Sequence, residues 1–170
     1  MKSNNKNNPY SNVLFGYTCV PAERFFGEDD SGFSVEVYAD GQMLYKTYIF
    51  PEIEKERKEY LISPAAVFDI ARILERHHKN IKSFKKSLNN GSCDGNGNYF
   101  IFSGTQYTTW NISHKNEMMT KIINPDYYKE YKPVIRQENQ MLQIFDEIAA
   151  ILKRHGICLS LDAITFKEKI

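Results

Sequence analysis

The most unusual segment of the sequence is the run Asn89–Asn98 (NNGSCDGNGN), which is rich in asparagine and glycine. Its three glycines can adopt positive φ angles, and successive backbone N–H groups in such a loop form concave arrays that hold anions. The run lacks the Gly-Lys-Ser/Thr ending with which a phosphate-binding P-loop brings a lysine and a magnesium ligand to the phosphates. A nucleotide site of that kind is therefore not predicted.

Three oxygen-bearing residues at alternate positions of this run, Asp94, Asn96 and Asn98, match the first ligands of a calcium-binding EF-hand loop. The match ends there, because Tyr99 stands where that loop needs glycine and Thr105 where it needs a bidentate glutamate. We therefore predict no metal site. The simpler interpretation is a structural loop whose Asn and Asp side chains hydrogen-bond their own backbone.

Cys93 is the candidate nucleophile of this loop, because surrounding backbone N–H groups would lower the pKa of its thiol. The four histidines that could act as its base are all remote in sequence: His77, His78, His114 and His155. A small-ligand or enzyme site built on the loop, with Cys93 and Asp94 as polar groups, is the alternative function. The simpler interpretation of Cys93 is a small packed residue.

Positive charge concentrates between Arg72 and Lys86, where six basic residues accompany one acidic residue. The segment Glu23–Glu59 has the opposite balance, with ten acidic and five basic residues, three of the acids being Glu28, Asp29 and Asp30. We predict two oppositely charged patches if both segments are exposed. Within the basic patch, the binding candidates are Arg72, Arg76 and Lys79.

A cluster of tyrosines, Tyr127, Tyr128 and Tyr131, is interleaved with lysines. Such a cluster could stack on unpaired bases of a nucleic acid or anchor a protein interface. A formal net charge of only +1 argues against nucleic acid, which domains with a clear excess of basic residues usually bind. The structural alternative is that the tyrosines cover the rim of the core and keep their hydroxyls in water.

With 170 residues, of which 42% are hydrophobic and 25% charged, the composition is that of one globular domain. We expect residues 1–12 to form a flexible tail and 13–170 a single domain. No stretch is apolar enough to span a membrane, and the opening residues are too polar for a signal peptide, so a cytoplasmic protein is expected. The odd number of cysteines without a Cys-x-x-Cys pair favours reduced thiols.

The clearest local pattern is a hairpin of Phe33–Tyr38 and Met43–Phe50 around a two-residue Asp40–Gly41 turn. In that register Val35 lies opposite Lys46, which makes Lys46 the one charged residue on the apolar face. There it would extend its ammonium to the edge or, less simply, into a pocket. A third strand is expected near Lys58–Ile62, after a charged connection, Glu52–Arg57, that stays in water.

Ser63 and Pro64 together are a helix start, followed by an apolar stripe that ends near His78–Asn80. Pro133 is expected to begin the longest helix, which runs to about Arg154 and ends at Gly156. Its polar run Arg136–Gln140 fits a solvated helix face as well as groups that converge on a ligand.

The remaining segments predict strands: Val13–Val20, a second hairpin of Tyr99–Phe102 and Gln106–Ile112 around Gly104, and a closing strand over Cys158–Leu161 and Ile164–Phe166. Phe100, Phe102, Trp110 and Ile112 are the core residues expected of that hairpin.

The order of these elements predicts an α+β fold: a mostly antiparallel sheet from two hairpins plus a C-terminal strand, with two main helices packed on one face. That core is expected to take up nearly all of the hydrophobic side chains, and no motif of an enzyme class or cofactor site is present. We therefore expect a non-catalytic binding module without a cofactor, whose partner is another protein held by the tyrosines and the basic patch. Nucleic-acid binding ranks third, no membrane is involved, and the oligomeric state stays open.

Overall fold

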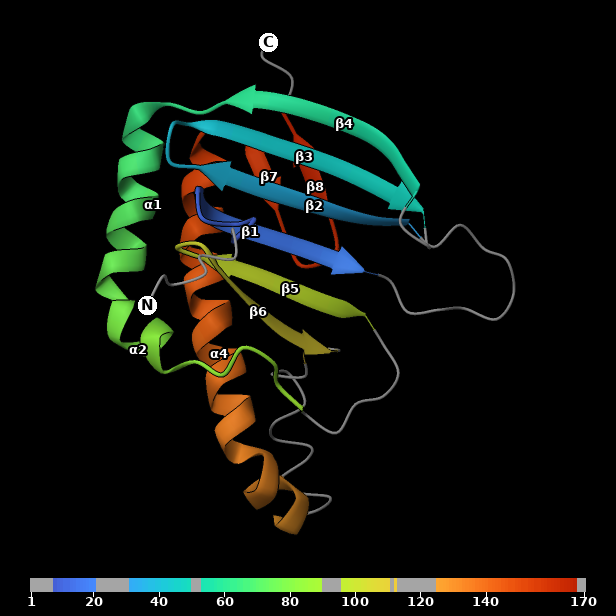
Figure 1. Ribbon diagram of the computed structural model, residues 1–170, viewed down its shortest axis with the longest axis vertical. Helices are drawn as coiled ribbons and strands as arrows, with labels where there is room; N and C mark the ends of the chain where they lie inside the picture. The colour runs from blue at the N-terminus through green and yellow to red at the C-terminus, as the bar shows by residue number, and fades with distance from the viewer. Residues whose placement is uncertain are drawn as a thin grey trace, which may run out of the picture.

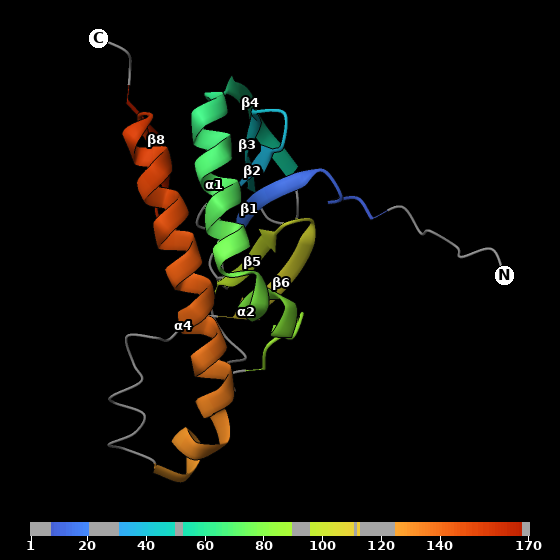
Figure 2. The same ribbon diagram turned by 90° about the vertical axis from the view of Figure 1, so that its left-hand side faces the viewer.

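In the computed structural model, the described residues are 8–20, 31–49, 53–89, 96–110, 112 and 125–167. They form a six-stranded antiparallel sheet with two long helices, α1 (Pro64–Arg76) and α4 (Pro125–Arg154), side by side on one face (Figure 1). Figure 2 shows the two helices next to each other, both on the same side of the strands. The predicted α+β class is confirmed.

The strands of the sheet lie in the order β4-β3-β2-β1-β5-β6. Their bounds are β1 Val13–Val20, β2 Ser31–Tyr38, β3 Gln42–Ile49, β4 Ile53–Leu61, β5 Gly97–Phe102 and β6 Thr105–Trp110. β1 is central, because it pairs with β2 on one side and with β5 on the other. It joins the β2–β3–β4 meander to the predicted second hairpin, whose turn holds Ser103 and Gly104 at φ 48° and 81°.

The first hairpin has a three-residue loop, Ala39–Gly41, instead of the predicted two-residue turn. Gly41 closes it with φ 90° and donates its N–H to the carbonyl of Tyr38 over 3.0 Å. The extra residue shifts the register by one, so Val35 lies opposite Tyr45, and Lys46 is opposite Ser34. Lys46 therefore faces away from the helices, 3.8 Å from Glu54, and is no misfit in the core.

β4 includes most of the charged segment that was expected to be a solvent connection. Its residues are exposed apart from Tyr60, as suits an edge strand, and its pairing with β3 is irregular between Thr47 and Tyr48. Within the described residues no strand pairs with its outer edge. Charges and a bulge on an edge strand discourage pairing with another chain.

The opposite edge of the sheet is covered by the connector that follows α2 (His78–Ser83). Thr108 of β6 donates its N–H to the carbonyl of Lys86 over 2.7 Å and accepts from the N–H of Leu88 over 2.9 Å. The side-chain amide of Gln137 on α4 bonds both the N–H and the carbonyl of Lys85, each over 2.9 Å. The long helix thus holds the connector against β6.

The sequence predicted the first residue of α1 correctly, but the predicted start of α4 at Pro133 is wrong. At α1, the Oγ of Ser63 accepts a hydrogen bond from the N–H of Ala66 over 3.1 Å, and Pro64 follows in the first turn, as predicted. Pro133, by contrast, lies inside α4. The proline frees the carbonyl of Lys129, and this part of the helix is exposed, so water can bond that carbonyl and the helix continues.

After α4, Gly156 adopts φ 83°, and the chain turns into a separate two-stranded sheet of β7 (Ile157–Leu159) and β8 (Ile164–Phe166). The predicted C-terminal strand is therefore present but does not extend the main sheet. The Phe166 ring stacks on Tyr60 at 4.3 Å between centroids and contacts Tyr45 edge-on at 5.3 Å. The small sheet therefore packs on the β3–β4 end of the helix-covered face (Figure 1).

The core lies between the helices and the sheet and is rich in aromatic rings, among them Phe15, Phe100 and Phe145. Trp110, predicted in the core, is instead 41% exposed on the uncovered face. Its ring lies over Gly97 on the neighbouring strand, where a Cβ would come within 3.1 Å of it. The glycine leaves a gap in the sheet surface that the tryptophan covers from outside.

Candidate functional site

The outer face of α1 exposes an aromatic side chain, Phe68, that the sequence analysis did not single out. Its ring is 62% exposed, although the neighbouring stripe of α1 is buried. The guanidinium carbon of Arg72, one helical turn further along, lies 5.8 Å from the centre of this ring, which is within cation–π distance. Phe68 and Arg72 together form the α1 ridge.

An apolar groove of about 510 Å³ lies on the sheet side of the α1 ridge. Leu61, at the end of β4, lines this groove with its side chain 80% exposed. Leu14, Val67 and Ala71 also line it. Of the four large apolar side chains that are exposed within the described residues, two, Leu61 and Phe68, therefore border the same hollow.

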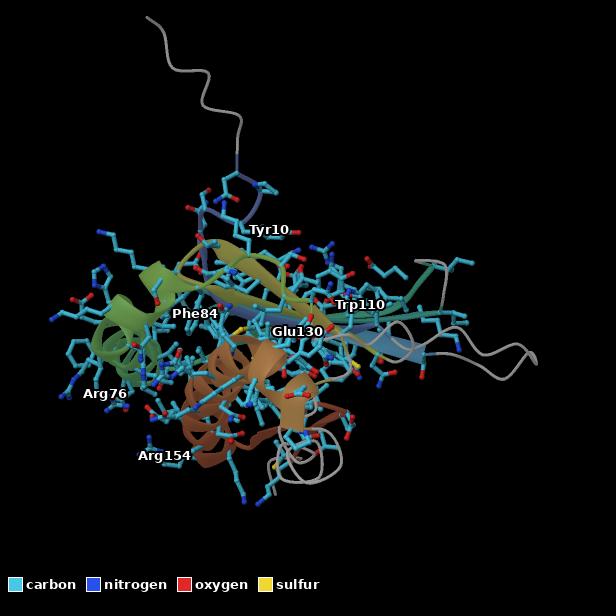
Figure 3. The ribbon with its side chains drawn as sticks, turned by 90° about the horizontal axis from the view of Figure 1, so that it is seen from below. Tyr10, Arg76, Phe84, Trp110, Glu130 and Arg154 are labelled. Atoms are coloured by element: carbon cyan, nitrogen blue, oxygen red, sulfur yellow. The ribbon has the colours of Figure 1, made fainter. Side chains whose placement is uncertain are left out.

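A second groove, of about 530 Å³, lies on the other side of the ridge, between α1 and α4. Ile73 and Ile151 are its buried apolar residues, and the exposed Ala150 lies between the helices. Arg76 from α1 and Arg154 from α4 border it, and Figure 3 shows both on the same flank of the molecule. We call this hollow the α1–α4 groove.

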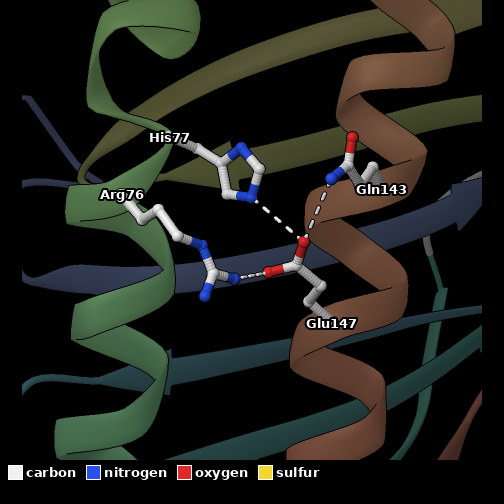
Figure 4. A network of polar contacts seen from close by, with 4 residues as sticks. All are labelled: Arg76, His77, Gln143 and Glu147. Carbon is white, nitrogen blue, oxygen red and sulfur yellow. Dashed lines mark hydrogen bonds and ion pairs between the residues drawn. The ribbon is translucent and has the colours of Figure 1, made fainter.

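The two helices are tied together at Glu147 of α4 (Figure 4). Arg76 forms an ion pair with this carboxylate, the Nε2 of His77 lies 3.1 Å from its Oε1, and Gln143 donates to the same oxygen over 3.2 Å. Burial alone would raise the pKa of Glu147, but the bonds with His77 and Gln143 and the charge of Arg76 outweigh it and lower the pKa. At neutral pH the carboxylate is therefore ionised and paired.

The predicted basic candidates Arg72, Arg76 and Lys79 are all exposed, the first two on α1 and the third on α2. Arg72 and Arg76 line the α1–α4 groove one turn apart. The acidic residues expected to form the opposite patch, Glu28–Asp30, lie outside the described residues.

Tyr127, Tyr128 and Tyr131 lie in the first two turns of α4. Of the three side chains only that of Tyr131 falls within the described part, and it is half-buried. From Tyr131 to Glu147, the residue that contacts Arg76, the helix rises about 24 Å. The structure therefore does not bring the tyrosines and the arginines of α1 into one small surface.

The candidate loop site is described only at its end, since Cys93 and Asp94 lie outside the described residues. Asn98 is buried, and its amide oxygen accepts from the hydroxyl of Tyr17 over 2.8 Å. Its amide nitrogen donates to the carbonyl of the half-buried Asn96 over 3.0 Å. The side chain of Asn98 thus binds the protein's own chain and fixes the end of the loop.

A buried polar row that sequence reasoning missed crosses three strands on the helix-covered face. Cys19 of β1 lies opposite Asn98 of β5, which lies opposite Thr109 of β6. The hydroxyl of Thr109 donates to the Oε1 of Glu138 on α4 over 2.6 Å. Burial raises the pKa of Cys19 and of the adjacent Tyr17, so both are neutral at pH 7 and the thiol is a poor nucleophile.

Glu138 is only 1% exposed, and Gln137 beside it is buried, so the run Arg136–Gln140 is not a uniformly solvated face. A signal for this was present, because Glu138 precedes Met141 by three residues and Phe145 by seven and so shares their apolar stripe.

Where the structure describes side chains, no three His, Cys, Asp or Glu residues come together in a way that could hold a metal ion. In that same portion of the chain, every helix is too short or too polar to cross a bilayer.

The sequence matches no protein-family model and no curated protein.

Proposed function

We propose that the chain is a non-catalytic binding module whose partner is another protein, and that the partner contacts the α1 ridge. The observation that carries the proposal is the pair of exposed apolar side chains, Leu61 and Phe68, on one groove. Large apolar groups gathered around one hollow are typical of protein-binding surfaces.

The residue types of the ridge are those that protein interfaces favour. Aromatic residues and arginine are enriched at such interfaces and anchor them. With a ring 62% exposed, covering Phe68 removes on the order of 120 Å² from water, worth about 3 kcal/mol. Arg72 beside it adds a charge that can orient the partner.

The experiment is affinity capture from an extract of the native cell, followed by binding measurements with the purified partner. Phe68→Ala is compared with Ile53→Ala, which truncates another exposed apolar residue, at the start of β4. Arg72→Glu is compared with Lys132→Glu, which reverses an exposed charge near the start of α4. We expect Phe68→Ala and Arg72→Glu each to weaken binding at least tenfold, while the two controls bind normally.

A partner that still binds both ridge variants would contradict the proposal. If Tyr131→Ala abolishes binding and Phe68→Ala does not, the partner contacts the tyrosine-bearing end of α4 instead, and the α1 ridge is not the interface.

A further inference from the structure

The flank of the molecule on which α2 lies beside α4 is built from segments rich in lysine (Figure 2). Two contacts place these segments side by side. The Nε2 of His77 lies 3.1 Å from the Oε1 of Glu147, and earlier on α4 the side chain of Gln137 bonds the backbone of Lys85. The chain from His77 to Lys85 therefore runs along α4 in the opposite direction.

Exposed acids are missing from both segments of this flank. The sequence from Arg76 to Asn89 contains no aspartate or glutamate. Between Glu130 and Asp146, the one acid of α4 is Glu138, which is 1% exposed and bonded to Thr109 of β6. The neighbouring strand β6 has no charged residue.

The same flank carries exposed cations. Five of them belong to it: Lys79 of α2, Lys85 and Lys86 of the connector, and Lys132 and Arg136 of α4. None of the five forms an ion pair with another residue that the structure describes. We call these five residues the α2–α4 basic surface. Lys82 is not counted, because it lines a different hollow together with Glu75.

The acids at the borders of the α2–α4 basic surface do not cancel its charge. Glu147 is paired with Arg76, and Asp126 with Lys129. Glu130 and Asp146 remain, against five cations. The formal net charge of +1 hides this excess, because other acids lie on β4, at the opposite edge of the sheet from β6.

The uncharged groups indicate which kind of anion fits. Lys132 and Arg136 line a hollow of about 370 Å³ on α4 whose other lining residues are the amides Asn139, Gln140 and Gln143. The large apolar side chains that are exposed in the described residues, Ile53, Leu61, Phe68 and Trp110, all lie elsewhere. Protein interfaces need such anchors, and so does insertion into a membrane, whereas the phosphates of a nucleic acid are held by cations and amides.

The aromatic residues favour a duplex over a single strand. Single strands are held by bases that stack on exposed rings. Of the described aromatic side chains at this surface, Phe84 is buried and Tyr131 is half-buried. Contacts with the backbone alone suffice for a duplex, whose bases stay paired.

We propose that the α2–α4 basic surface binds the phosphate backbone of a double-stranded nucleic acid without reading its sequence. This surface shares no residue with the α1 ridge, so the proposal does not depend on the protein partner proposed above.

The test is fluorescence anisotropy of the full chain with labelled DNA and RNA duplexes of about 20 base pairs, at about 50 to 200 mM salt. Five phosphate contacts predict a slope of log affinity against log salt of about −4.5, which is a loss of about 500-fold over that range. Binding of either duplex with a steep slope supports the proposal, and the tighter duplex names the class of nucleic acid.

Lys85→Gln and Arg136→Gln each remove one of these contacts. We expect each variant to bind roughly tenfold more weakly at about 50 mM salt, with a slope shallower by about 1 and an unchanged melting temperature. The matched controls, Lys55→Gln on β4 and Arg154→Gln at the far end of α4, remove exposed charges elsewhere. Both controls should bind like the wild type, and so should Phe68→Ala.

Three other ligands test the choice of a duplex: vesicles that contain phosphatidylserine, polyglutamate with as many charges as the duplex, and the single strand of the same sequence. If any of them binds at least as tightly as the duplexes, the proposal is wrong. It is equally wrong if neither duplex binds at about 50 mM salt, or if Lys85→Gln and Arg136→Gln both bind like the wild type.

Discussion

Replacing Tyr17 with phenylalanine removes one buried hydroxyl that joins three parts of the fold. This hydroxyl lies 2.8 Å from the amide oxygen of Asn98 on β5 and 2.7 Å from the carbonyl of Leu161, between β7 and β8. The Tyr17 ring is packed against Phe100 and Phe145, with centroids 5.0 Å away in each case. Phenylalanine keeps these ring contacts, so the substitution isolates the hydrogen bonds.

The expected cost is about 2 kcal/mol of unfolding free energy, because the buried oxygen of Asn98 and the half-buried carbonyl of Leu161, which share the one hydroxyl proton, lose their donor. For a chain of this size that corresponds to a fall in melting temperature of about 4–8 °C. Urea unfolding and calorimetry measure both quantities. The matched control, Tyr60→Phe, removes a hydroxyl from a half-buried ring and should change stability by less than about 0.5 kcal/mol.

Hydrogen exchange adds a local measurement to the Tyr17→Phe experiment. The backbone N–H of Ser160 is bonded to the carbonyl of Ala163 over 2.8 Å in the β7–β8 turn, and we expect its exchange to accelerate most. A variant as stable as the wild type, with unchanged exchange at Ser160, would refute the idea that Tyr17 holds the C-terminal sheet to the main sheet.

Three further substitutions test the polar contacts. The pKa of Glu147 is lowered in the folded state, so the ionised carboxylate stabilises the protein at neutral pH, and this stabilisation is lost as the pH falls through that pKa. Glu147→Gln should therefore destabilise the protein at neutral pH but not in strong acid. Urea unfolding measured at both pH values tests this. Burial and the Glu36 carboxylate, 2.6 Å away, raise the pKa of Tyr38 to about 12, and Glu36→Gln should lower it in an ultraviolet titration; no change would exclude this contact. Ser63→Ala should cost about 1 kcal/mol in thermal unfolding through loss of the α1 cap, whereas an unchanged stability would mean that the cap contributes nothing.

Sequence reasoning succeeded where the determining residues are neighbours in the chain. Ser63 and Pro64 begin a helix, and Gly104 occupies a tight turn, because capping and positive φ angles are local properties. The loop of the first hairpin was misjudged by one residue, and since side chains alternate between the two faces of a strand, that error placed Lys46 on the wrong face.

The missed features depend on residues far apart in sequence. Glu138 is buried because α4 places it against Thr109 and the sheet, and Trp110 is exposed because it lies on the face of the sheet that the helices do not cover, over Gly97 of the neighbouring strand. For the candidate site, Arg72 and Arg76 were identified from their charge. Phe68 was not identified, because its exposure depends on how β4 and α4 pack beside α1.

The two edge strands of the main sheet, β4 and β6, are protected from pairing with another chain in different ways, and α4 takes part in one of them. At β4 the guard is built into the strand itself, as charges and an irregular register. At β6 the protection comes from the connector after α2, which the Gln137 side chain holds by two hydrogen bonds to the backbone of Lys85. If these hydrogen bonds were lost, we expect backbone groups of β6 to become exposed, where they could pair with a strand of another chain. The Gln137 side chain of α4 thus adds to the backbone hydrogen bonds of Thr108 in keeping the β6 edge covered.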